Sequence, residues 1–149
     1  MKRLIIATLL LMTISAKAQK LVIGSKMPEW KSIEWLSPLK KSDKAIFVEF
    51  YQSNNPGSAK ILMNLESIYT KYGSKIQVVI LTREHGSAID LLVMQYGSKF
   101  AIGYDASGRE FEALGVKFLP FSMLFSSDKE LYWQGNQTKL TTETLDNVD

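Results

Sequence analysis

The 149 residues contain no cysteine, and 18 basic side chains stand against 15 acidic ones, which gives a formal net charge of +3. The length suits one domain of ordinary size, and that domain must be held together by an apolar core because no disulfide bond is possible. The sequence has no histidine cluster, acidic calcium loop or glycine-rich phosphate loop, so we expect neither a metal nor a cofactor.

The first 18 residues have the pattern of a bacterial-type export signal. A basic Lys2-Arg3 pair precedes an apolar run over residues 4–14, and Ala16-Lys17-Ala18 fits the A-x-A cleavage pattern. The apolar run is too short to span a bilayer, and Gln19 stands where a lipoprotein would carry its lipidated cysteine. We therefore expect a cleaved signal peptide (1–18), one domain over residues 19–149, and a periplasmic or secreted protein that is not inserted in a membrane.

Cleavage of this signal would also remove the net charge. Lys2, Arg3 and Lys17 leave with it, so 15 basic side chains remain against 15 acidic ones. The basic excess therefore belongs to the signal, and composition no longer favours a nucleic acid or an anionic membrane as a partner.

The segment between the signal and residue 45 has weak patterns. Residues 20–23 are apolar enough to predict a short strand, and residues 38–44 predict a polar, basic loop. Large apolar side chains between them are expected to cover one edge of the core, with an exposed tryptophan patch as the alternative. These side chains are Trp30, Ile33, Trp35 and Leu36.

The remainder of the chain is organised around a strand, a polar turn and a long helix. Residues 45–51 form an apolar, aromatic run broken only by Glu49, which is typical of a strand covered on both faces. Asn55 is a suitable N-cap and Pro56 suits the first position of a helix. Apolar side chains then recur at helical spacing, and Gly73 predicts the helix end.

The later elements alternate between strand and helix. Residues 75–82 predict a second buried strand, which should lie parallel to the first because a helix connects them. Further patterns indicate a helix capped by Ser87 and ending at Gly97, an extended piece at 100–104, a brief helix at 109–114, a hairpin of 121–125 with 131–133, and a last helix capped by Thr141 or Thr142.

Short motifs also follow one another in a characteristic order. They are Gly24 and Pro28 within residues 23–28, the strand residues Val48 to Tyr51, Tyr104-Asp105, Gly115-Val116, Leu119-Pro120, and Asp128 with Gly135. In this order the chain resembles the TlpA-like thiol–disulfide oxidoreductases, which have a thioredoxin fold and are related to the AhpC/TSA family. The resemblance covers essentially all of residues 19–149. It implies a central mixed β-sheet flanked by helices, in a β-α-β-α-β-β-α core with an N-terminal extension, and a cis bond before Pro120.

The chain departs from this family at the redox motif. The family's Cys-x-x-Cys falls on Asn55-Pro56-Gly57-Ser58. Thiol–disulfide exchange needs one thiolate that attacks and a second sulfur that resolves the mixed disulfide. An amide and a hydroxyl supply neither, so the inherited redox function is excluded unless the sequence is an engineered, cysteine-free variant.

The resemblance also implies an ancestral role for Glu49. In related thioredoxins a buried acid near this position helps to move protons to and from the inner cysteine. Without that thiol, Glu49 is either a leftover, partly buried carboxylate or the partner of a lysine such as Lys60 or Lys75.

Two classes of function remain. The first is a non-catalytic scaffold or binder of an unidentified protein or peptide, in which the segment beside the cis-proline pairs with an extended chain. Its candidate residues are Tyr51, Phe118, Leu119 and Phe121, with inward-pointing rings as the alternative. The second is an enzyme of a non-thiol kind that uses Ser58 and His85 with Glu49, the residue types of a nucleophile, a base and an acid.

Overall fold

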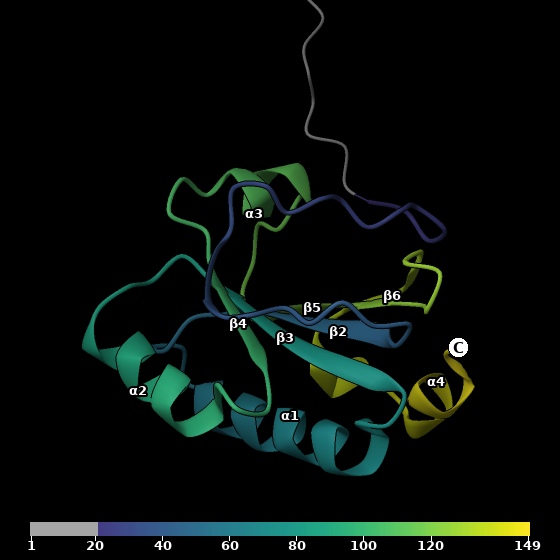
Figure 1. Ribbon diagram of the computed structural model, residues 1–149. Helices are drawn as coiled ribbons and strands as arrows, with labels where there is room; N and C mark the ends of the chain where they lie inside the picture. Colours follow the sequence, from purple (N-terminus) through teal and green to yellow (C-terminus); the bar gives the residue numbers. More distant parts are fainter. Residues whose placement is uncertain (1–20) are drawn as a thin grey trace, which may run out of the picture.

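The computed structural model describes residues 21–149, so the expected signal peptide, its cleavage site and Lys20 lie outside the described residues. The elements follow the order β1 (Glu34–Ser37), β2 (Ala45–Tyr51), α1 (Ser58–Tyr72), β3 (Ile76–Thr82), α2 (Ser87–Tyr96), β4 (Ala101–Tyr104), α3 (Arg109–Ala113), β5 (Phe121–Phe125), β6 (Leu131–Gly135), the 3₁₀ helix η1 (Gln137–Lys139) and α4 (Thr142–Asn147). The strands form one mixed sheet in the order β1-β4-β3-β2-β5-β6 (Figure 1). The predicted fold class, α/β with a central mixed sheet flanked by helices, is confirmed.

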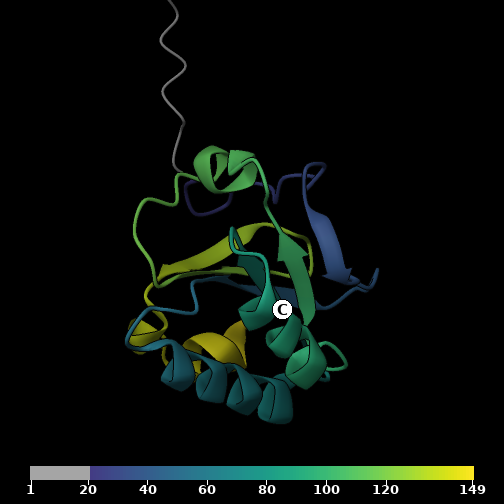
Figure 2. The same ribbon diagram turned by 90° about the vertical axis from the view of Figure 1, so that its left-hand side faces the viewer.

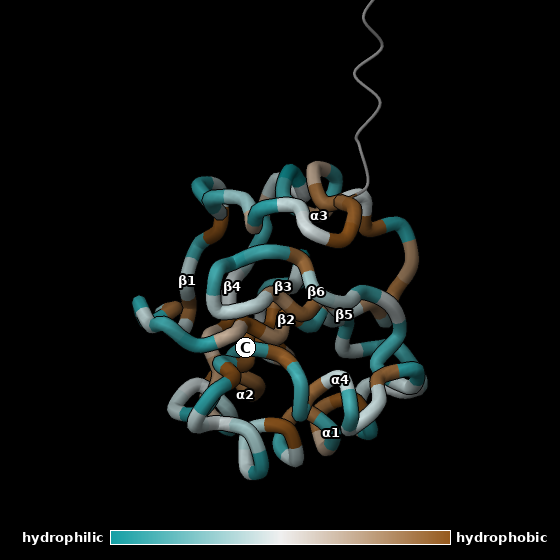
Figure 3. The backbone as a smooth tube through the Cα atoms, turned by 90° about the vertical axis from the view of Figure 1, so that its right-hand side faces the viewer, coloured by the Kyte–Doolittle hydropathy of each residue, from teal (hydrophilic) through white to brown (hydrophobic). Residues whose placement is uncertain are grey.

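Strand β2 lies in the interior of this sheet. All seven of its residues are buried, and it pairs with β3 in parallel from Ala45 opposite Ile76 to Tyr51 opposite Thr82. On its other side it pairs with β5 in antiparallel register. The parallel arrangement predicted from the intervening helix is confirmed. The backbone tube is brown, and so hydrophobic, where β2 runs through the middle of the molecule (Figure 3).

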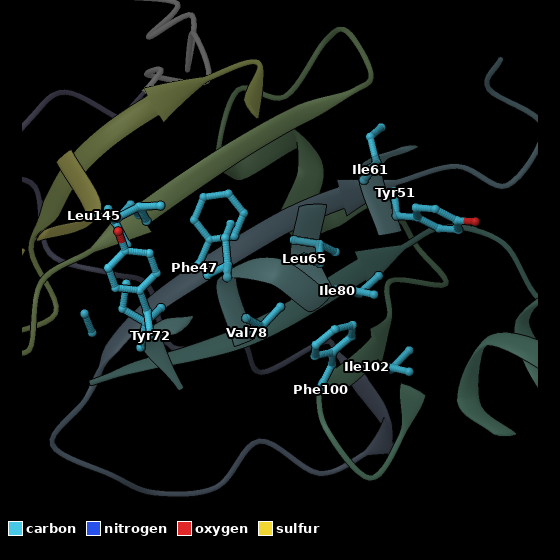
Figure 4. Close-up of a cluster of buried hydrophobic side chains, with 14 of the residues drawn as sticks. Phe47, Tyr51, Ile61, Leu65, Tyr72, Val78, Ile80, Phe100, Ile102 and Leu145 are labelled. Carbon is cyan, nitrogen blue, oxygen red and sulfur yellow. The ribbon is translucent and has the colours of Figure 1, made fainter. Parts of the chain in front are cut away.

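Each face of the sheet has its own apolar core. Helices α1, α2 and α4 cover one face, whereas α3 and the segment before β1 cover the other (Figures 1 and 2). Phe47, Leu65 and Phe100 belong to the first core, which Figure 4 shows in close-up. Trp30 and Phe50 belong to the second, together with Phe111 of α3. Alternating side chains of β2 therefore enter opposite cores, as the two-residue period of a strand requires.

The segment before β2 differs from its prediction in two ways. Leu21–Ile23 is not a strand: the chain turns at Gly24, whose φ of 91° favours glycine, and Val22 and Ile23 are exposed. In contrast, β1 was not predicted, although it pairs with β4 in antiparallel register.

The large apolar side chains of this segment mostly cover the core as expected. Trp30 and Ile33 are buried and Trp35 packs against the second core, with its ring 5.9 Å from that of Trp30. Leu36 is exposed, so its expected burial was wrong. The pairing register of β1 shifts between Trp35 and Ser37, and this irregularity leaves Leu36 outside.

Helix ends were predicted closely. Gly73 and Gly97 end α1 and α2, and the Thr141 hydroxyl caps α4 by accepting the N–H of Thr144. Ser87 is the first residue of α2 rather than its cap, which is Gly86. Within residues 21–149, no helix is long and apolar enough to cross a membrane.

Helix α1 offers a matched test of the core. Leu65 is fully buried against β2 and β3, whereas Met63 on the same helix is 67% exposed. We expect Leu65→Ala to lower the free energy of unfolding by about 2–5 kcal/mol, since it removes buried apolar contacts and leaves a cavity. Met63→Ala should change it by no more than about 0.5 kcal/mol. Urea denaturation measures both, and equal effects would contradict this placement of α1.

Candidate functional site

The polar turn between β2 and α1 is built differently from its prediction. Helix α1 begins at Ser58 with Gly57 as its cap, so Asn55 is not the N-cap and Pro56 is not the first helical residue. The Asn55 Oδ1 instead accepts the N–H of Gly57 at 3.2 Å, and its backbone oxygen accepts the N–H of Ser58 at 3.0 Å. Asparagine often folds back on the backbone in this way, which makes a turn before the helix rather than a cap.

Side chains hold this turn in place. The carboxylate of Glu84, which follows β3, accepts the backbone N–H of Ser53 at 2.7 Å and its hydroxyl at 2.8 Å. The Ser58 hydroxyl donates to the Ser53 carbonyl at 3.0 Å. The sequence analysis did not identify Glu84, because no local pattern connects it with a residue 31 positions earlier.

The turn also contacts the loop before β5. The Asn55 Nδ2 donates to the backbone oxygen of Leu119 at 3.3 Å, and the Leu119-Pro120 bond is cis, as the resemblance implies. The segment matching the family's redox motif and the segment matching its cis-proline thus meet, although 64 residues separate the two hydrogen-bonded partners.

Glu49 lies in β2 at the centre of a buried polar network. Its Oε2 accepts hydrogen bonds from the Ser122 hydroxyl and from the Gln137 Nε2, the latter at 3.0 Å, and the Gln137 oxygen accepts from Asn64 at 2.8 Å. Its Oε1 is buried and has no hydrogen-bond partner among the described residues. Burial raises the pKa of the Glu49 carboxyl to about 7 from 4.5, and the bonds from Ser122 and Gln137 offset this only partly.

Neither lysine considered as a partner for Glu49 reaches it. Lys75 donates to the backbone oxygens of Asp146 and Val148, and Lys60 is exposed on α1. Glu49 is therefore an acid held by neutral donors, and it is fully buried rather than partly buried.

The structure does not assemble the three residues considered for non-thiol catalysis. The Ser58 hydroxyl donates to the backbone, Glu49 bonds to Ser122 and Gln137, and His85 is exposed with its ring 5.9 Å from that of Tyr104. Among residues 21–149, no group of three or more His, Cys, Asp or Glu side chains is placed to hold a metal ion.

The four apolar binding candidates differ in exposure. Phe118 is 83% exposed. Leu119 and Phe121 are half-buried and pack against the second core, where the Phe121 ring lies 6.0 Å from that of Phe50. Tyr51 is buried at the end of β2. Of these four side chains, Phe118 is therefore the most exposed beside the Leu119-Pro120 bond.

Comparison with known proteins identifies the fold. No family model matches the sequence, and no curated protein matches it. Among solved structures, the chain is similar to a thioredoxin-like protein in the oxidized form, with a TM-score of 0.69, 14% identity, and coverage of 85% of this chain and 98% of that one.

Two bacterial structures show the same likeness. A protein of Chlorobium tepidum, assigned as the thiol:disulfide interchange protein DsbE, matches with a TM-score of 0.67, 19% identity, and coverage of 78% of this chain and 86% of its own. A mutant of PrxQ from Xylella fastidiosa matches with a TM-score of 0.64, 15% identity, and coverage of 86% and 93%. The fold is therefore thioredoxin-like, in a chain that contains no cysteine.

The raised pKa of Glu49 predicts a pH-dependent stability. The folded protein keeps this proton up to about pH 7, whereas the unfolded chain releases it near pH 4.5. The free energy of unfolding should therefore fall by roughly 3 kcal/mol as the pH rises through that interval. Glu49→Gln keeps a neutral side chain of the same shape, so it should abolish the fall and be neutral or stabilising at neutral pH.

Urea denaturation across this pH interval measures the effect. Glu34→Gln is the matched control, because Glu34 is exposed and makes no side-chain hydrogen bond among the described residues. A loss of several kcal/mol in Glu49→Gln at neutral pH would contradict the assignment, since that is the cost of breaking a buried ion pair.

The turn geometry predicts that sulfur chemistry can be restored. Asn55 and Ser58 are the ends of a hydrogen-bonded four-residue turn, whose end Cα atoms lie within about 7 Å, and a disulfide spans about 4.4–6.8 Å. Asn55→Cys combined with Ser58→Cys should form an intramolecular disulfide and gain thiol–disulfide exchange, helped by the nearby helix N-terminus, which favours a thiolate.

Mass spectrometry after alkylation detects the bond, and each single variant is the control. If the double variant folds but its thiols stay reduced under mild oxidant, the alignment of Asn55 and Ser58 with the family's cysteines is wrong.

Proposed function

We propose that the chain is an exported thioredoxin-like domain that has lost thiol redox chemistry and binds extended polypeptide without turning it over. The observation that carries the proposal is the exposed Phe118 ring beside the cis Leu119-Pro120 bond, next to a turn from which both sulfurs are absent. The experiments below test the binding and the export separately.

The loss of redox chemistry follows from the side chains now in the turn. The Asn55 amide donates to Leu119 and accepts from Gly57, and the Ser58 hydroxyl donates to Ser53. No thiol in the 149 residues can attack or resolve a disulfide. The side chains at the former redox positions instead serve to fix the turn and the loop against each other.

The loop has free backbone donors for an extended partner. The N–H groups of Lys117, Phe118 and Leu119 form no hydrogen bond among the described residues. An extended peptide can pair with such groups as an added strand, while side-chain contacts give specificity. The Asn55 amide already holds the Leu119 oxygen, and this bond restrains the loop before binding, which lowers the entropic cost of association. Phe118 then supplies an aromatic anchor of the kind that dominates binding energy.

Binding is tested with reduced, carboxymethylated α-lactalbumin, a permanently unfolded polypeptide, labelled for fluorescence anisotropy. We expect saturable binding that Phe118→Ala weakens roughly tenfold, because truncating an aromatic anchor commonly costs more than 1 kcal/mol. Met94→Ala is the matched control, since Met94 is 74% exposed on α2, outside this loop.

Equal affinities of the two variants would contradict the proposed surface. Labelling of the wild-type protein by a serine-reactive fluorophosphonate, lost in Ser58→Ala, would favour the enzyme instead.

Export has its own test. When the chain is produced in a bacterial host, we expect a product outside the cytoplasm that begins near Gln19, because residues 1–18 have the pattern of a cleaved signal. A variant lacking residues 2–18 should stay in the cytoplasm. Cell fractionation and N-terminal sequencing measure both, and an uncleaved cytoplasmic product of the full chain would contradict export.

A further inference from the structure

A cavity of about 730 Å³ lies at the opposite end of the sheet from the proposed polypeptide-binding loop. Its walls come from the loop at residues 37–44, the end of α1, the start of β3, and the connection from α2 to β4. The turn at residues 52–57 follows the carboxyl end of β2, whereas this loop precedes its amino end. A seven-residue strand separates the two sites by roughly 20 Å.

The cavity is strongly basic. Its lining includes five lysines and not one aspartate or glutamate, although residues 19–149 carry equal numbers of basic and acidic side chains. The lysines are Lys40, Lys41, Lys44, Lys71 and Lys99. They come from three separate segments of the chain, so their charge surrounds the cavity instead of marking one helix face. Residues 19–149 contain 15 basic side chains, and a third of them line this cavity.

Two of the five lysines already have partners. The Lys44 Nζ donates to the Gly73 oxygen at 2.6 Å, which neutralises part of the negative end of the α1 dipole, and Lys99 pairs with Glu66 at 2.9 Å. Lys71 lies with its Nζ 5.0 Å from the centre of the Tyr72 ring. Helix capping thus explains only part of the cluster.

The positions of Lys40 and Lys41 at the cavity are not explained by a partner within the protein. Neither side chain forms a hydrogen bond or ion pair among the described residues, and both line the cavity. The hydroxyls of Ser74 and Ser98 also line the cavity, and they make no hydrogen bond with residues 21–149. The cavity therefore offers uncommitted ammonium groups and hydroxyl donors together.

We propose that this cavity binds a small molecule carrying two or more phosphate groups. Its volume falls in the range of small-molecule sites and exceeds what one phosphate group needs. Lysine is a common ligand of phosphate oxygens, as a point charge with three donors on a flexible stem. An anion with several phosphate groups engages lysines from more than one wall at once, whereas a single phosphate reaches only some of them. The site is independent of the proposed polypeptide binding.

Inorganic tripolyphosphate is the probe, measured by isothermal titration calorimetry on the whole protein at low ionic strength. We expect binding that Lys40→Ala combined with Lys41→Ala weakens roughly tenfold, as the loss of two partly screened charge pairs predicts. Orthophosphate should bind more weakly than tripolyphosphate, and added salt should weaken both.

The matched control is Lys60→Ala combined with Lys139→Ala. It removes the same charge from two exposed lysines that do not line the cavity, and should leave the affinity within about twofold. Equal weakening in both double variants would overturn the proposal, because it would show attraction to overall charge alone. Absence of binding to the wild-type protein, or unchanged affinity in Lys40→Ala with Lys41→Ala, would overturn it as well.

Discussion

Strand β2 is buried on both faces along all seven of its residues, and the rest of the structure is placed relative to it. Its backbone pairs with β3 on one side and with β5 on the other, and its side chains enter the two cores in alternation. Since these residues exclude water, a polar group on β2 is costly to bury unless it has a partner inside the protein. This constraint shapes the site at its carboxyl end and the network around Glu49.

Of these groups, the Glu49 carboxyl has the largest free-energy cost of burial. A charged carboxylate without a cation is costly to bury, so the group keeps its proton to a higher pH. Ser122 and Gln137 supply hydrogen bonds from β5 and η1, but both are neutral donors. The acid is therefore compatible with the core mainly in its protonated form. The 149 residues contain no thiol with which this acid could exchange a proton.

Hydrogen bonds hold the turn between β2 and α1. The Glu84 carboxylate accepts two hydrogen bonds from Ser53, and the Asn55 amide donates one to the backbone oxygen of Leu119. The polar groups of residues 53–58 are thus largely paired within the protein, while the N–H groups of the neighbouring loop have no partner among the described residues. The exposed Phe118 ring therefore lies beside a turn whose polar side chains are committed to hydrogen bonds within the protein.

Elements with local signals could be predicted from the amino-acid sequence. The apolar run at residues 45–51, the stops at Gly73 and Gly97, and the cap at Thr141 depend on neighbours within a few positions, so their patterns are visible without the fold. The absence of thiol chemistry can also be established from the sequence, because thiol chemistry needs a cysteine and the 149 residues contain none. Strand β1 was not predicted, because its pairing register shifts after Trp35 and its apolar and polar side chains do not alternate regularly.

Contacts between residues that are distant in the chain could not be predicted in this way. Glu49 is bonded by residues 73 and 88 positions away, and the lysine-lined cavity joins three segments that share no motif. Phe118 and Phe121 are near neighbours of one type, yet one ring faces solvent and the other packs near Phe50. Both residues are phenylalanine, but the environments of their side chains differ. Side-chain burial depends on the backbone path and on the residues that pack across from it, and a local sequence pattern contains neither.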